Sequence, residues 1–178
     1  MRCERAIFCG AGGQGLLTIG KLLAGLAVER FPHVTYIPSY GAEVRGGVSN
    51  CRVILSDGEI ASPVVEQADA IVAMNQPSAD RFLPMLVPDG TAFVNTSLVV
   101  PPAGLERVVA LPATQWAQEF GDIRTANMVM LGAYLGRRDL LVPERVLRAI
   151  EECAPRVGRQ TTDANRRCFL RGWDAARA

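Results

Sequence analysis

Apolar residues along this chain form short continuous runs in some places and recur every three or four residues in others. The short runs, bounded by Gly, Pro, Asn or Asp, indicate buried β-strands of about four to eight residues. Six of them predict strands, at Ala6–Cys9, Val34–Ile37, Val48–Leu55, Ala70–Met74, Thr91–Asn95 and Arg107–Leu111. The chain therefore contains enough strand for one sheet.

Helical spacing is clearest after Gly15, where apolar residues recur on one side of a predicted helix and Lys21 and Glu29 fall on the other. The apolar positions of that helix are Leu16, Ile19, Leu22, Leu23, Leu26 and Ala27. Pro77 suits the first turn of the next helix. The later helices are predicted at Ser78–Leu83, Thr114–Phe120, Thr125–Leu135, Pro143–Cys153 and about Thr162–Trp173.

Strands alternate with helices in the first half of the chain and give way to helices in the second. This order is typical of an α/β sandwich with a mixed, largely parallel sheet, a Rossmann-like first βα unit and a helical C-terminal part. No repeat or linker divides the sequence, so we expect residues 1–178 to form a single domain. Two turns are also predicted, Ser56–Glu59 with hairpin character and Pro88–Gly90 before the fifth strand.

Composition narrows the class of protein. Of the 178 residues, 49% are hydrophobic and 21% charged, and the net charge of +1 argues against nucleic acid or an anionic membrane as the main partner. The N-terminus has no apolar run of signal-peptide length. The longest apolar stretch, Leu16 to Val28, is too short to span a bilayer and contains Lys21. We therefore expect a cytoplasmic protein.

The thiols and the imidazole give no metal or catalytic centre. Five cysteines, odd in number and without a Cys-x-x-Cys pair, form neither a disulfide framework nor a ligand set for zinc or an iron–sulfur cluster. We expect buried, reduced thiols and no metal bound by this chain. His33, the only histidine, lacks a second imidazole and reads as a surface residue. The catalytic residues stay unknown from the sequence.

A glycine-rich loop, Gly10-Ala11-Gly12-Gly13-Gln14-Gly15, follows the first predicted strand and opens the first predicted helix. In that setting, backbone N–H groups and a helix N-terminus cradle a phosphate. The structural alternative is that the glycines only permit a tight turn and close packing of helix on strand. We take Gly10, Gly12, Gly13, Gln14 and Gly15 as candidate cofactor-binding residues.

The sequence matches two nucleotide-binding motifs only in part. Use of NAD needs an acidic residue at the end of the second strand, and Tyr36-Ile37-Pro38-Ser39 contains none, nor an Arg for NADP. The stretch from Gly15 to Lys21 resembles a P-loop, but Leu22 stands where Ser or Thr must hold Mg²⁺. We therefore expect neither NAD(P) binding nor nucleotide hydrolysis, while another phosphate-bearing ligand remains open.

The second glycine-rich segment, Ser39–Gly47, carries Glu43 and Arg45 between glycines. One interpretation is a solvated turn in which the two charges pair weakly. The other is an anion-binding or subunit-docking loop, because Arg presents a rigid fork to carboxylate or phosphate. Residue chemistry alone leaves the two interpretations even, and we keep Glu43 and Arg45 as candidate binding residues.

Taken together, these motifs resemble the gamma subunit of 2-oxoacid:ferredoxin oxidoreductases, the pyruvate/ketoisovalerate oxidoreductase catalytic-domain family. The resemblance runs from about Ile7 to Gly172 and includes both glycine loops. It also includes Ile60–Val65, Ala73–Ser78, Ala126–Gly132, Asn165 and Gly172. Met-Asn-x-Pro-Ser and Asn-Met-Val-Met-Leu-Gly resemble gamma subunits of 2-oxoglutarate-type enzymes more than the related indolepyruvate oxidoreductase beta subunit. One departure is Ala42, where the family often has Pro.

The resemblance implies oxidative decarboxylation of a 2-oxoacid, with 2-oxoglutarate favoured, by coenzyme A to acyl-CoA, CO₂ and reduced ferredoxin. It implies that thiamine diphosphate and [4Fe–4S] clusters lie on partner subunits of thiamine-binding, alpha and ferredoxin-like type, with ferredoxin as electron acceptor. Asn127, in the Asn-Met-Val-Met-Leu-Gly motif, joins the candidate binding residues. The alternative from another class is a stand-alone nucleotide-binding or regulatory module that uses the Gly10–Gly15 loop.

Overall fold

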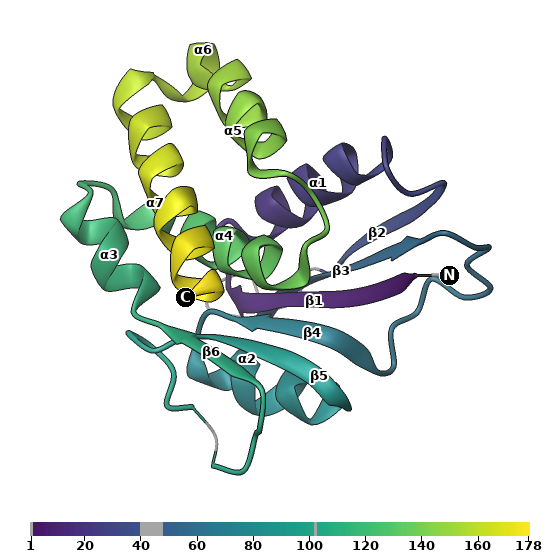
Figure 1. Cartoon of the computed structure of the whole chain (residues 1–178). Coiled ribbons are helices and arrows are strands. Elements are labelled where there is room, and N and C mark those ends of the chain that lie inside the picture. Colours follow the sequence, from purple (N-terminus) through teal and green to yellow (C-terminus); the bar gives the residue numbers. More distant parts are fainter. Residues whose placement is uncertain (1, 40–47, 102) are drawn as a thin grey trace.

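The computed structural model describes residues 2–39, 48–101 and 103–178 (Figure 1). Within them, six strands form one sheet in the order β2-β3-β1-β4-β5-β6. The strands are β1 (Cys3–Ala11), β2 (His33–Ser39), β3 (Val48–Ser56), β4 (Ala68–Ala73), β5 (Leu86–Asn95) and β6 (Val108–Leu111). Each predicted strand overlaps one of them, with only Met74 and Arg107 falling just outside.

The sheet is mixed and largely parallel, as predicted. The pairs β1–β4, β4–β5 and β5–β6 are parallel, whereas β3 runs antiparallel to both β1 and β2. Because the parallel strands share one direction, the carboxyl ends of β1, β4, β5 and β6 meet at the same edge of the sheet. That edge carries the candidate site.

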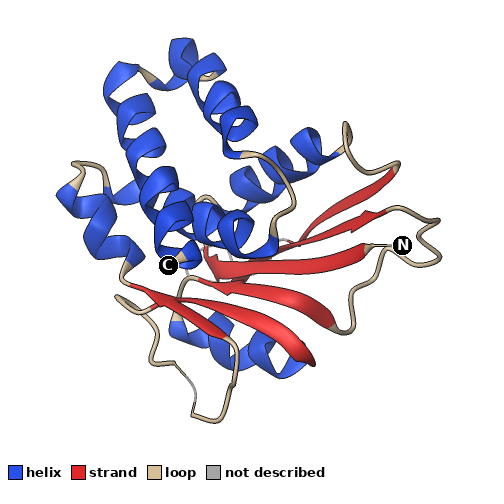
Figure 2. Cartoon of the chain, viewed as in Figure 1, coloured by secondary structure: helices blue, strands red, loops and turns tan. Residues whose placement is uncertain are grey.

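Helices cover both faces of the sheet (Figure 2). The α-helices are α1 (Leu16–Ala27), α2 (Gln76–Phe82), α3 (Ala113–Glu119), α4 (Ala126–Arg138), α5 (Pro143–Glu152), α6 (Ala154–Val157) and α7 (Arg159–Arg177), with 3₁₀ turns at Leu83–Met85 and Ile123–Thr125. The core beside α2 is separate from the larger core, which α1, α4 and α7 form on the opposite face. This arrangement confirms the α/β sandwich.

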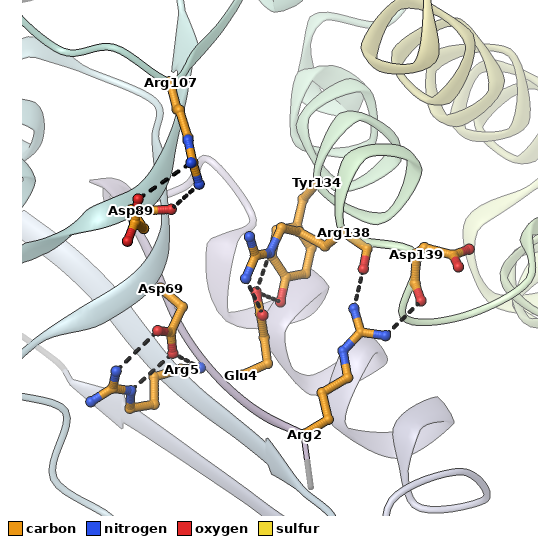
Figure 3. Close-up of polar contacts among 9 residues, drawn as sticks. All are labelled: Arg2, Glu4, Arg5, Asp69, Asp89, Arg107, Tyr134, Arg138 and Asp139. Atoms are coloured by element: carbon orange, nitrogen blue, oxygen red, sulfur yellow. Dashed lines mark hydrogen bonds and ion pairs between the residues drawn. The ribbon is translucent and has the colours of Figure 1, made fainter.

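Tyr134 of α4 is the largest fully buried side chain of the larger core. Its ring makes edge-to-face contacts with Phe8 at 5.4 Å and Phe93 at 5.6 Å between centroids. Its hydroxyl donates a hydrogen bond of 3.2 Å to the buried carboxylate of Glu4. Arg138, one turn further along α4, donates to the same carboxylate at 2.9 and 2.6 Å (Figure 3). These contacts fix α4 across β1, β4 and β5.

Helices α4 and α7 cross at unusually short range because glycines face each other. A Cβ added to Gly172 would collide with the carbonyl oxygen of Val129, and one added to Gly132 with that of Phe169. Gly136 is similarly confined by the backbone of Trp173. Gly132 and Gly172, both part of the family resemblance, therefore have a packing role.

Both predicted turns differ from the structure. Ser56–Glu59 does not form a hairpin, because β3 pairs with β1 and β2, and β4 lies beyond β1. Instead, the backbone N–H of Asp57 donates to the carbonyl of Arg2, which ties the turn to the start of β1. Pro88–Gly90 is part of β5: Ala68 faces Leu86 and Ala70 faces Thr91, so four residues of β5 bulge out opposite one of β4.

Two smaller differences have local causes. The second strand continues through Pro38 to Ser39, since β2 is an edge strand and tolerates a residue without an N–H. The short helix α6 was not predicted. It begins directly after α5 with Pro155 in its first turn and ends at Gly158, whose φ is +86°.

Candidate functional site

The candidate site lies at the edge of the sheet where the connections that follow the neighbouring strands β1 and β4 turn to opposite faces. After β1 the chain enters α1 on one face, and after β4 it enters α2 on the other (Figures 1 and 2). In open α/β sheets, the crevice outside the carboxyl ends of the strands at such a switch point is the usual place for a ligand. Here the crevice opens between the glycine loop after Ala11 and the segment that follows Ala73.

Gln14 holds the glycine loop in shape. Its Oε1 accepts a hydrogen bond of 2.7 Å from the N–H of Ala11, and its Nε2 donates to the carbonyl of Met74 at 3.4 Å. Gly13 and Gly15 have φ of +88° and +73°, a backbone conformation that L side chains rarely adopt. The loop is therefore preformed and fastened to the segment after β4.

The remaining glycines of the loop play different parts. A Cβ on Gly10 would lie 2.8 Å from Leu16 Cδ1 and 2.9 Å from Met74 Cβ, so Gly10 is required by packing. Gly12 is exposed, and no atom lies within 4 Å of where its Cβ would be. Gly10 thus serves the fold, while the open space beside Gly12 leaves the outer side of the loop accessible to a ligand.

Asn127, another candidate binding residue, lies against the same loop. Its Nδ2 donates to the carbonyl of Gly15 at 3.2 Å, although 112 residues separate the two in sequence. Asn127 is the second residue of α4, so this bond brings the N-terminus of α4 to that of α1. Neither helix has an acidic residue in its first turn or a side-chain cap. The N-terminus of α1 is thus open to an anion, whereas α4 continues from the 3₁₀ turn Ile123–Thr125, whose start is capped by the Asp122 carboxylate.

A cleft of about 200 Å³ adjoins the loop. Its lining residues are Gly13, Gln14, Met74, Leu98, Thr114, Ile123, Arg124 and Ala126. Leu98 and Ile123 are large apolar residues that are about half exposed. The cleft is thus bounded by the glycine loop on one side and by an apolar rim on another.

Arg124 stands at this cleft and was not singled out from the sequence. Its guanidinium donates to both carboxylate oxygens of Asp122, at 2.9 and 2.7 Å. These hydrogen bonds lower the pKa of Asp122, so the carboxylate stays ionised and holds the exposed guanidinium at the cleft. The pattern Asp-x-Arg just before a helix start is the signal that could have identified it.

Asn95 organises the neighbouring part of the edge. Asn95 is fully buried at the end of β5. Its Nδ2 donates to the hydroxyl of Thr114 at 2.8 Å and to the carbonyl of Met74 at 3.4 Å. Asn95 is not among the candidate residues predicted from the sequence. A polar residue at the carboxyl end of a buried parallel strand was the available signal.

Glu43 and Arg45 lie outside the described residues. The flanking residues Ser39 and Val48 lie at the ends of β2 and β3, and Val48 pairs with Ala11, directly before the glycines. Because β3 stands between β1 and β2, the end of β2 lies two strands away from the first loop. This spacing is a second reason to expect no NAD, whose acidic partner normally lies on the adjacent strand.

The thiols are free, but only three are buried, which partly corrects the prediction. Burial raises the pKa of Cys9 far above its usual range, that of Cys51 to about 12, and that of Cys168 as well. Cys3 and Cys153 are exposed, because a strand start and a helix end leave them outside the core. Within the described residues, no three His, Cys, Asp or Glu side chains gather that could hold a metal ion. His33 is exposed, as predicted.

Fold and site thus define an α/β protein with a preformed glycine loop at the switch point of its sheet. The family model for pyruvate ferredoxin/flavodoxin oxidoreductase matches residues 5–175, and the chain belongs to this family. It is 30% identical to the 2-oxoglutarate synthase subunit KorC of Methanocaldococcus jannaschii, covering 94% of this chain and 91% of that one. It is 37% identical to the ketoisovalerate oxidoreductase subunit VorA of Methanothermobacter thermautotrophicus over 74% of this chain, but spans only 28% of that longer relative.

Solved structures of similar proteins have the same fold. The gamma subunit of a keto/oxoacid ferredoxin oxidoreductase from Geobacter sulfurreducens superposes with a TM-score of 0.80 at 31% identity, covering 97% of this chain and 98% of that one. A 2-oxoglutarate:ferredoxin oxidoreductase from Magnetococcus marinus, solved with 2-oxoglutarate, coenzyme A and succinyl-CoA bound, shares the fold with a TM-score of 0.86 at 21% identity; the match covers 99% of this chain and 31% of that one. No helix of the described residues is long and apolar enough to cross a membrane.

Proposed function

We propose that this chain is the gamma subunit of a 2-oxoacid:ferredoxin oxidoreductase, and that its glycine loop binds the phosphates of coenzyme A. The assembled enzyme converts a 2-oxoacid, with 2-oxoglutarate favoured, to acyl-CoA and CO₂ and reduces ferredoxin. The observation that supports a binding role is the convergence of Gly13, Gly15 and Asn127 at the uncapped N-terminus of α1.

The redox and decarboxylation chemistry belongs on partner subunits. Thiamine diphosphate there supplies the electron sink for decarboxylation, and iron–sulfur clusters carry the electrons away. The thiols described in this chain do not suit a cluster, because Cys9, Cys51 and Cys168 are buried singly and have raised pKa values. This chain therefore contributes binding and orientation of the acyl acceptor rather than electron transfer.

The loop and the N-terminus of α1 both favour an anion. A helix N-terminus stabilises a nearby anion by about 0.3–1 kcal/mol. Arg124, whose exposed guanidinium is paired with Asp122, is a charged donor at the same cleft. The apolar rim at Leu98 and Ile123 suits the uncharged part of a long ligand. The cleft itself, at about 200 Å³, holds only part of a molecule as large as coenzyme A.

Gly12→Glu tests the binding site, because it adds a carboxylate where open space surrounds the loop. In the assembled complex, we expect the KM for coenzyme A to rise about tenfold, equivalent to about 1.4 kcal/mol, with the KM for the 2-oxoacid unchanged. Gln67→Glu adds the same charge at an exposed position before β4, at the opposite edge of the sheet, and serves as the control. Equal coenzyme A kinetics in the two variants would reject the loop as the phosphate site.

A further inference from the structure

Helix α1 is apolar on the side turned away from the sheet as well as on the side packed against it. Between Leu16 and Ala27 only Thr18 and Lys21 are polar. A helix at the surface of a soluble protein normally presents charged and polar residues outward, as α5 and α7 do here. Instead α1 leaves Leu17, Leu22 and Leu26 only partly buried.

This outer side of α1 forms one wall of a groove of about 550 Å³. Tyr36 of β2 closes one side, and its hydroxyl donates a hydrogen bond of 3.0 Å to the carbonyl of Leu17. Cys153 and Arg156, at the junction of α5 and α6, close the other. The groove is open along the helix and large enough to receive secondary structure rather than a single side chain.

Gly25 lies in the groove at a position where this chain does not require glycine. It is exposed in the interior of α1, and nothing lies within 4 Å of where a Cβ would be. Glycine in a helix interior costs about 1 kcal/mol relative to alanine. Gly132 and Gly172 show what offsets such a cost in this protein, namely close approach of another helix. At Gly25 no described residue of this chain makes such an approach.

The charges of the groove select the kind of partner. Lys21 and Arg156 line it, and no carboxylate is among the described residues that do. Glu29, just beyond the end of α1, is already paired with Arg145. A second copy of this surface would therefore bring like charges together, whereas a helix with acidic residues beside its apolar face would neutralise both cations.

We propose that the outer face of α1 docks a helix of a partner subunit, which crosses at Gly25 and places carboxylates opposite Lys21 and Arg156. The proposal rests on the proposed function, because it assumes that this chain assembles with other subunits of an oxidoreductase. It assigns to α1 two tasks at once: its N-terminus faces the candidate ligand site, and its outer side holds the complex together.

The test is capture of partners by the tagged full-length chain, co-expressed with the thiamine-binding, alpha-type and ferredoxin-like subunits of the same source. Gly25→Trp blocks close approach, and Lys21→Glu reverses a groove charge. Each is expected to lower the captured partner about tenfold. Gln118→Trp, on an exposed position of α3, adds the same bulk elsewhere and is expected to leave capture unchanged. Thermal unfolding of each isolated chain checks that the variants are folded.

The outcomes separate the two proposals. If the unaltered chain captures no oxidoreductase subunit, the proposed function is rejected and this inference with it. If the unaltered chain assembles and both groove variants assemble equally well, the function stands and the inference is overturned. If the isolated chain forms a dimer that Gly25→Trp dissociates, the occupant is a second copy, which also overturns the proposal of a different subunit.

Discussion

Glu4 is buried at the start of β1, and its carboxylate receives hydrogen bonds from Arg138 and Tyr134. Removing one member of such a pair leaves the other without its charge partner in a medium of low polarity. Glu4→Gln should therefore lower the free energy of unfolding by about 3 kcal/mol, measured by urea denaturation. Asp89→Asn, at the exposed pair with Arg107, is the control and should change it by less than about 1 kcal/mol. Similar losses in both variants would contradict the assignment.

Asp69 provides a pH-dependent contribution at the amino end of β4. Burial alone would raise its pKa, but hydrogen bonds from the side chain and backbone of Arg5 outweigh burial, so the pKa is lowered on folding. The pair thus stabilises the fold above the unfolded-state pKa of about 3.9, and this stability is lost as the pH falls through the folded-state pKa.

Asp69→Asn should accordingly lower the free energy of unfolding at pH 7 by up to about 1 kcal/mol, because the pair is partly exposed. The deficit should shrink as the pH is lowered from about 5 towards 3, since the unaltered chain then loses the same interaction. Urea denaturation across this pH range measures it. A deficit that is constant from pH 7 to pH 3 would show that the charge of Asp69 is not the cause.

At the scale of elements, the crossing of α4 and α7 depends on glycine. Gly172→Ala should destabilise the chain by about 3 kcal/mol, because the added Cβ collides with the carbonyl of Val129 and the two helices must separate. Gly25→Ala is the matched control: the same substitution on an open helix surface should stabilise the isolated chain by about 0.5–1 kcal/mol. Thermal or urea unfolding gives both values, and equal signs for the two would refute the argument.

Local pattern predicted the elements but not their arrangement. The short apolar runs identified the strands, most clearly the central ones, which are buried on both faces, and helical spacing with Pro and Gly at the ends identified most helices. Strand order and the insertion of β3 between β1 and β2 depend on contacts far apart in sequence. The four-residue bulge of β5 was interpreted as a turn, since Pro88 and Gly90 favour turns and only the pairing with β4 shows the strand continuing.

For the whole molecule, the candidate site was predicted in part. The glycines and Gln14 belong to one loop and follow from its motif, and Asn127 came from the resemblance alone. Its bond to Gly15 could not be derived from spacing. Arg124 and Asn95 each carry a weak local signal, but only the packing of distant segments brings them to the edge beside the glycine loop.

The isolated chain should be catalytically silent. If the chemistry belongs on partner subunits, 2-oxoacid-dependent reduction of a viologen dye will be absent with this chain alone and restored when the thiamine-binding and ferredoxin-like subunits are added. The isolated chain should also be colourless, without absorbance near about 400 nm from an iron–sulfur cluster. Turnover by the purified chain would disprove the division of labour between subunits.

Because three of the five thiols are buried and two are exposed, their reactivity reports both folding and assembly of this protein. Cys9, Cys51 and Cys168 lie in the core and should react with a maleimide only after unfolding, so their labelling rate measures global opening. Cys3 and Cys153 are exposed and should react in the native chain. Since Cys153 borders the groove beside α1, a helix seated there would shield it while Cys3 stayed reactive. Mass spectrometry of the labelled thiols would then distinguish the folded, unfolded and assembled chain in a single sample.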